Sequence, residues 1–148
     1  MEVGNVKIVS FIMLIILSLY ISYSDVRYRI ISNLTVISVA VISVILLFAN
    51  DNNKFYQHLL PIFVIGFVLF KLKWIAAGDV KLFAAFSLAI SSDHLLSSLH
   101  IILLSGGVLA VFCLMYQGIN RHNRSIIKGI PYGVAICIGS LFGIAASL

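Results

Sequence analysis

The chain has 148 residues, of which 61% are hydrophobic and only 10% are charged, and its mean hydropathy is +1.14. A soluble domain of this size could not cover so much apolar surface, so the composition excludes a soluble globular protein and indicates an integral membrane protein. The net charge of +5 does not indicate a nucleic-acid partner, because the basic residues are scattered between apolar segments, where membrane topology explains them better.

Six apolar runs predict six transmembrane helices in a single domain that covers residues 1–148. The expected fold class is therefore an all-α integral membrane protein. Most runs reach the length of a membrane span only by including the polar residues that flank them. In chain order, the runs are Ile8–Tyr23, Leu34–Ala49, Phe55–Phe70, Leu82–Ile90, Leu95–Gln117 and Pro131–Leu148.

The first run is expected to remain in the protein as a permanent helix. Lys7 followed by an apolar run resembles a signal peptide. No small-residue cleavage site follows this run, however, and further spans come after it.

The fourth run is too short to cross a bilayer on its own. A helix from Leu82 to Ser92 rises only about 16 Å, which is roughly half the thickness of the hydrocarbon layer. It spans the membrane only if residues 76–81 also enter the membrane region. In that case the short run draws Asp79 toward the apolar phase.

The loops between the runs differ strongly in basic residues. Alternate connections carry eight lysines and arginines on one side of the membrane, and the other side carries two. This asymmetry predicts that the first set faces the cytoplasm, with Asp25 and Asp79 on the same side and both termini on the non-cytoplasmic side. The eight residues are Arg27, Arg29, Lys71, Lys73, Lys81, Arg121, Arg124 and Lys128, and the two are Lys7 and Lys54.

Asp25 and Asp79 are the strongest candidates for functional residues. The chain has only five acidic residues, and these two lie at the borders of apolar segments. A carboxylate near hydrocarbon costs about 2.5 kcal/mol or more. Either aspartate alone is explained by an interfacial pair with a neighbouring lysine or arginine. Two carboxylates on the same side of a membrane instead predict acid/base chemistry with a shared proton.

The segment that begins at Asp25 is expected to form a tight turn between the first two helices. Arg29 could pair with Asp25 if the first helix continues that far. Either Ser32 or Asn33 could cap the second helix, because both side chains carry an oxygen that accepts from the first free N–H groups.

Three motifs resemble those of the type IV prepilin peptidases, most closely the short forms associated with Tad/Flp-type pili. The first is Asp-x-Arg-x-x-x-Ile-x-Asn from Asp25 to Asn33, and the second is Gly-Asp-Val-Lys-Leu from Gly78 to Leu82. The third, Ile130-Pro131-Tyr132-Gly133, opens the last run. Gly-Asp alone is a weak signal, but the three motifs occur in the right order and extend over nearly the whole chain.

The resemblance implies a membrane aspartic endopeptidase in which Asp25 and Asp79 are the catalytic pair. Its expected partners are the lipid bilayer and a prepilin, whose positively charged leader is removed at the cytoplasmic face of a bacterial inner membrane. No nucleic acid, metal or cofactor is expected. Larger relatives also methylate the pilin and carry an insertion with Cys-x-x-Cys pairs. Asp25 to Leu34 leaves no room for it, so neither methyltransferase activity nor zinc is expected.

The expected mechanism follows from the charge of the two carboxylates. Because both cannot ionise cheaply at close range, one proton is shared between them. The ionised partner draws a proton from a water molecule that attacks the scissile carbonyl, while the protonated partner polarises this carbonyl. The sequence does not say which aspartate acts as the base.

Six further residues are candidates for supporting roles, each with a simpler alternative. The basic ones either act on the acids and the substrate or are ordinary interfacial anchors. The glycine before Asp79 permits a close backbone approach or a positive φ. The proline and glycine of the third motif either belong to the site or only start and pack the last helix. The six are Arg29, Asn33, Gly78, Lys81, Pro131 and Gly133.

One departure from the family pattern and one other class of protein leave alternatives open. The signature is Gly-x-Gly-Asp, and Ala76 replaces its first glycine. Alanine impairs the site if this position needs a left-handed backbone conformation. If the position needs only a small residue for helix packing, alanine is tolerated. A non-catalytic pilus-assembly relative is therefore one alternative, and a small proton- or cation-coupled transporter is another. The oligomeric state is also open, a homo-oligomer included.

Overall fold

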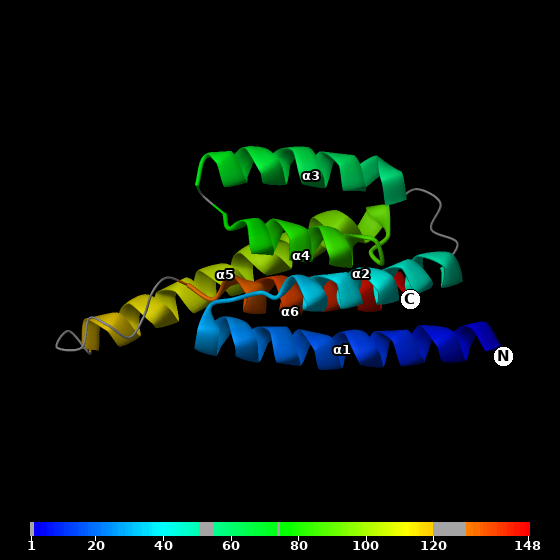
Figure 1. The fold of residues 1–148 in the computed structure, drawn as a ribbon, viewed down its shortest axis with the longest axis horizontal. Coiled ribbons are helices and arrows are strands. Elements are labelled where there is room, and N and C mark those ends of the chain that lie inside the picture. The colour runs from blue at the N-terminus through cyan, green and yellow to red at the C-terminus, as the bar shows by residue number, and fades with distance from the viewer. Residues whose placement is uncertain (1, 51–54, 74, 120–129) are drawn as a thin grey trace.

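The computed structural model describes residues 2–50, 55–73, 75–119 and 130–148. The described residues form six α-helices and no β-strand (Figure 1), which confirms the all-α fold class. In chain order the helices are α1 (Glu2–Tyr28), α2 (Asn33–Ala49), α3 (Phe55–Lys71), α4 (Ala77–Ser87), α5 (Ser92–Ile119) and α6 (Tyr132–Ser147).

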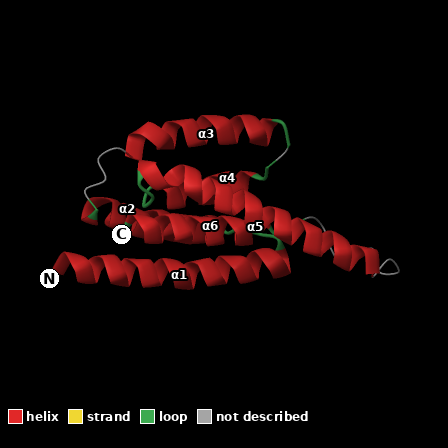
Figure 2. Cartoon of the chain, turned by 180° about the vertical axis from the view of Figure 1, so that it is seen from behind, coloured by secondary structure: helices red, strands yellow, loops and turns green. Residues whose placement is uncertain are grey.

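Successive helices run in opposite directions, so that both termini lie at the same end of the bundle (Figures 1 and 2). At the opposite end, α1, α3 and α5 finish and α2, α4 and α6 begin. We call it the aspartate end, because Asp25 lies in the last turn of α1 and Asp79 in the first turn of α4. Arg27 and Lys71 lie in last turns at the same end. Lys54, Arg121, Arg124 and Lys128 are outside the described residues.

Two helical segments are long and apolar enough to cross a bilayer, Val3–Tyr28 and Ser92–Tyr116. Three shorter helical segments are also apolar: Asn33–Ala49, Leu59–Lys71 and Tyr132–Ser147. Large apolar side chains are exposed on α1, as on much of the bundle, and a helix that is apolar on all faces is typical of a membrane protein. The six spans and the side on which the termini lie stay predictions.

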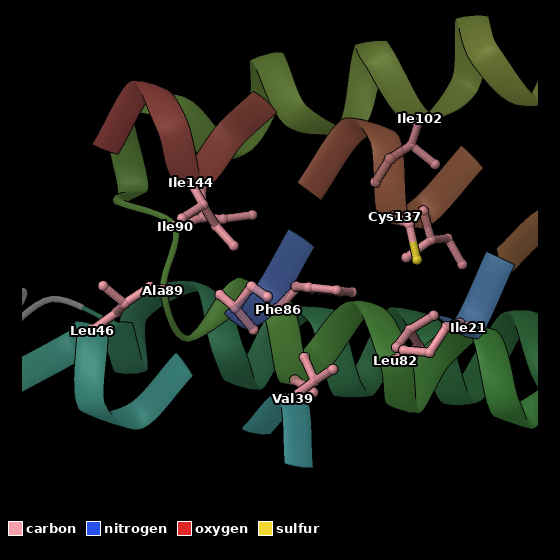
Figure 3. Close-up of a cluster of buried hydrophobic side chains, with 13 residues drawn as sticks. Ile21, Val39, Leu46, Leu82, Phe86, Ala89, Ile90, Ile102, Cys137 and Ile144 are labelled. Atoms are coloured by element: carbon pink, nitrogen blue, oxygen red, sulfur yellow. The ribbon is translucent and has the colours of Figure 1, made fainter. Parts of the chain in front are cut away.

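The shortest helix, α4, has 11 residues and lies in the middle of the bundle. It packs against α2, α3 and α6, and α6 in turn packs against α1 and α5. Leu82 and Phe86 of α4 are fully buried in a cluster with Ile21, Val39 and Ile144 from three other helices (Figure 3). This packing fixes the first turn of α4, with Asp79, relative to the end of α1 and the start of α6.

The most extensive helix pairing is the seam between α5 and α6, which depends on glycine. A Cβ atom on Gly139 would lie 2.8 Å from the backbone nitrogen of Ile102 and 2.9 Å from the carbonyl oxygen of Ser98. The Ser98 hydroxyl donates a hydrogen bond of 2.8 Å to the carbonyl oxygen of Gly139. One turn further, a Cβ on Gly143 would lie 2.8 Å from Cβ of Ser98. Small residues spaced by four allow this close approach of two membrane helices.

Gly139→Ala is expected to destabilise the protein by about 1–3 kcal/mol, the usual range for overpacking. The new methyl group meets backbone atoms of α5, which cannot rotate away as a side chain can. Unfolding in detergent micelles, followed by circular dichroism, measures the change. Gly107→Ala on α5 is the matched control, because a Cβ there meets nothing within 4 Å. Equal stability of the two variants would show that the close approach of α5 and α6 does not depend on glycine at position 139.

Candidate active site

Asp25 is buried, with 7% of its surface exposed, and it joins α1 to α6. Its Oδ2 atom accepts a hydrogen bond of 2.8 Å from the backbone N–H of Gly133 in the first turn of α6. The first N–H groups of a helix have no partner inside the helix and carry a partial positive charge. The start of α6 is therefore suited to hold a carboxylate.

Gly133 has no room for a side chain. A Cβ atom at this position would lie 2.8 Å from Oδ2 and 3.1 Å from Cγ of Asp25. Pro131, at the N-cap of the same helix, is buried. Sequence reasoning left open whether this proline and glycine only start and pack the last helix, and the structure shows that the glycine also touches Asp25.

Asp79 is half-buried at the start of α4, where the N-cap residue is Ala76. The Ala76 backbone N–H donates a hydrogen bond to the Asp79 carboxylate, as the third helical residue of a capping box accepts one. Asp79 lies outside both long apolar segments. Burial and the nearby charge of Asp25 raise its pKa to about 6, against the lowering effect of this hydrogen bond. The two carboxylates thus lie within electrostatic range of each other.

Ala76 does not distort the start of α4. Its backbone has φ −74° and ψ 147°, an extended conformation that alanine adopts without strain. A left-handed conformation, which would have favoured glycine, is absent at this residue. Gly78 is also free of it, and a Cβ there would make an ordinary contact of 3.5 Å with Ile31. Neither a positive φ nor a close approach explains Gly78 in this structure.

Ala76→Gly is expected to give no large gain in the activity of the site. The substitution keeps the N–H that bonds Asp79, and at an N-cap the difference between glycine and alanine is about 1 kcal/mol or less. Cleavage of a prepilin by the two forms, compared at equal protein level, measures the effect. A gain of more than about tenfold, which corresponds to about 1.4 kcal/mol, would show that alanine cripples the site.

Arg29 lies beyond the end of α1, not within the helix, since α1 ends at Tyr28. Its backbone is left-handed, with φ 57°, and its N–H donates to the carbonyl oxygen of Asp25 at 3.1 Å. The charge of Arg29 also acts on the Asp25 carboxylate. The two residues therefore interact, and α1 continues beyond Asp25 to Tyr28, so the tight turn that was expected from Asp25 begins only at Arg29.

The remaining candidates, Asn33 and Lys81, make no described contact with either carboxylate. Ser32, not Asn33, is the N-cap of α2, and its hydroxyl oxygen accepts from the Leu34 N–H at 3.3 Å. Asn33 is exposed as the first residue of α2, and Lys81 is exposed on α4. Among the described residues, no three His, Cys, Asp or Glu side chains gather as metal ligands would.

The arrangement offers two carboxylates that interact electrostatically, each with a backbone N–H donor from the start of a helix. Such a pair can share a proton and act on one substrate as base and acid. Sequence reasoning identified both carboxylates and named Gly133 as a candidate, but it did not predict that backbone N–H groups donate to the carboxylates. The signal that pointed to one of these donors was Pro131-Tyr132-Gly133, since proline favours the first positions of a helix and glycine permits close approach.

Comparison with known proteins identifies the family of the chain. A family model described as the type IV leader peptidase family matches residues 12–115, more than half of the chain. The matched part includes Asp25 and Asp79, and Gly133 lies beyond it. No curated protein and no solved structure matches the chain. The chain belongs to the type IV leader peptidase family.

Proposed function

We propose that this protein is a membrane aspartic endopeptidase that removes the basic leader peptide from Flp-like prepilins. Membership of the leader peptidase family supports a peptidase that acts on prepilins. The observation that carries the aspartic mechanism is the meeting of Asp25 and Asp79 at one end of the bundle, close enough for the charge of one to act on the other.

The pair acts by general acid/base catalysis on a water molecule. One ionised carboxylate takes a proton from water, and the resulting hydroxide attacks the scissile carbonyl. The protonated carboxylate donates a hydrogen bond to the carbonyl oxygen and stabilises the negative charge that develops there. No covalent bond to the enzyme forms.

The substrate places two demands on the site, and two features of the aspartate end support this function. The apolar helix of a prepilin stays in the lipid, so its leader emerges at the level of the headgroups. Asp25 in the last turn of α1 and Asp79 in the first turn of α4 both lie at one end of the bundle, which supports a site at this level. The pair also supplies a local negative charge for a basic leader, at an end where the described residues otherwise include Arg27, Arg29, Lys71, Lys73 and Lys81. We place this end at the cytoplasmic face of the inner membrane.

The test is cleavage of a co-expressed Flp-type prepilin in a bacterium that has no prepilin peptidase of its own. We expect a shorter pilin on a gel, with a new N-terminus directly after the glycine that precedes the apolar helix. A prepilin in which this glycine is replaced should stay uncut. If the leader remains on the wild-type prepilin although the enzyme is present in the membrane, the proposal fails.

A coupled transporter is not favoured by any observation. Ion-coupling residues of transporters typically lie near the midplane of the membrane, at interrupted helices. Asp25 and Asp79 lie in terminal turns at one end of the bundle instead.

A further inference from the structure

The two carboxylates of the site have different surroundings. Burial disfavours the ionised form of Asp25, as it does that of Asp79, but Asp25 also accepts the Gly133 N–H at 2.8 Å, at the positive end of α6. It also faces the positive charge of Arg29, which is held one turn away by the bond from its N–H to the Asp25 carbonyl. Of the other groups packed around it, Asp79 comes from α4, and the thiol of Cys137 on α6 is within electrostatic range.

Three influences act most strongly on the Asp79 carboxylate, and only one of them, the hydrogen bond from the Ala76 N–H, favours its ionised form. The other two, burial and the charge of Asp25, both favour its neutral form. The nearest cation along α4, Lys81, is two residues away and exposed. Residues two apart lie on different faces of a helix, so Lys81 is not expected to reach the Asp79 carboxylate.

We infer that the start of α6 and Arg29 together hold Asp25 as the ionised member of the pair, and that the shared proton stays on Asp79. The inference rests on the proposed function for its catalytic meaning and assigns the two roles within it. Asp25 is the base that activates water, and Asp79 is the acid that meets the scissile carbonyl. Gly133 and Arg29 are positioning residues, because they act through Asp25.

The assignment gives a balanced reaction. Water transfers a proton to Asp25 as its oxygen bonds to the carbonyl carbon, and Asp79 transfers its proton to the carbonyl oxygen. The intermediate is a gem-diol. Asp25 then delivers its proton to the amide nitrogen as the C–N bond breaks, and a hydroxyl of the gem-diol returns a proton to Asp79. The products are a carboxylic acid and an amine, and the pair is restored.

Carbon-13 NMR of the aspartate side chains tests the assignment without a substrate. The chain has only four aspartates, so protein labelled at the aspartate carboxyl carbon gives four signals in micelles. The single variants Asp25→Asn, Asp51→Asn, Asp79→Asn and Asp93→Asn assign them by the signal that each removes. We expect the Asp25 signal to reach its ionised position at a lower pH than the Asp79 signal. The reverse order, or a common midpoint for both, would overturn the inference.

Arg29→Gln tests the part assigned to the guanidinium. We expect the interval between the two titrations to narrow in Arg29→Gln and to be kept in Arg29→Lys, which retains the charge. A purely structural role for Arg29 would leave the interval unchanged in both, and this outcome would remove Arg29 from the inference. Because the titrations need no peptidase activity, they can fail while prepilin cleavage succeeds, and they can succeed while prepilin cleavage fails.

Discussion

Asparagine at position 25 or at position 79 is expected to slow the removal of the prepilin leader by about 10³-fold or more, since each carboxylate acts as a base or an acid in the reaction. Asparagine keeps the size of the side chain but can neither take a proton from water nor donate an acidic one. Each single change should be nearly as damaging as both together, because neither carboxylate can do the work of the pair alone.

Cleavage of the Flp-type prepilin by each variant, measured at equal amounts of membrane-inserted protein, checks this result. Asp93→Asn is the matched control, because Asp93 is exposed in the first turn of α5, away from the aspartate end. Unfolding in micelles shows whether the variants are folded. A folded Asp25→Asn or Asp79→Asn that retains more than about a tenth of the activity would exclude the acid/base pair.

Properties that arise within short stretches of the chain could be predicted from the sequence. Four of the six apolar runs lie within a helix, and the last run extends past α6 by one residue at each end, because a run of apolar residues near the length of a span is itself the signal. The fourth run predicted the bounds of its helix less well, because α4 begins at Ala77, five residues before the run begins. Asp25 and Asp79 stood out because charge is rare in this chain.

Properties that depend on contacts between distant helices could not be predicted. The Gly133 N–H meets an aspartate 108 residues away, and nothing near Gly133 in the sequence indicates this partner. The same holds for Gly139, whose contact with α5 depends on how the two helices pack. The left-handed backbone of Arg29 was not predicted, because arginine rarely adopts it; the sequence indicated a tight turn from Asp25, whereas α1 continues to Tyr28.

Gly133→Ala is expected to lower prepilin cleavage by about 10²-fold, the loss that a displacement of roughly 1 Å in a catalytic group can cause. The new Cβ would lie 2.8 Å from Oδ2 of Asp25, so the carboxylate has to move and loses the N–H that it accepts. A hydrogen bond to a charged group contributes about 1.5–3 kcal/mol. Asparagine at position 25 removes the carboxylate, whereas alanine at position 133 keeps it and changes only where it lies.

The start of α6 cannot easily shift to make room for the new methyl group. Tyr132 packs so closely against α5 that a Cβ on Gly106 would lie 2.9 Å from Cζ of its ring. The strain of Gly133→Ala therefore falls on the Asp25 side chain, and activity should fall more than stability does. Gly107→Ala, which adds the same methyl group in open space, should retain both. A Gly133→Ala protein that cleaves prepilin at the rate of Gly107→Ala would show that the start of α6 has no part in placing Asp25.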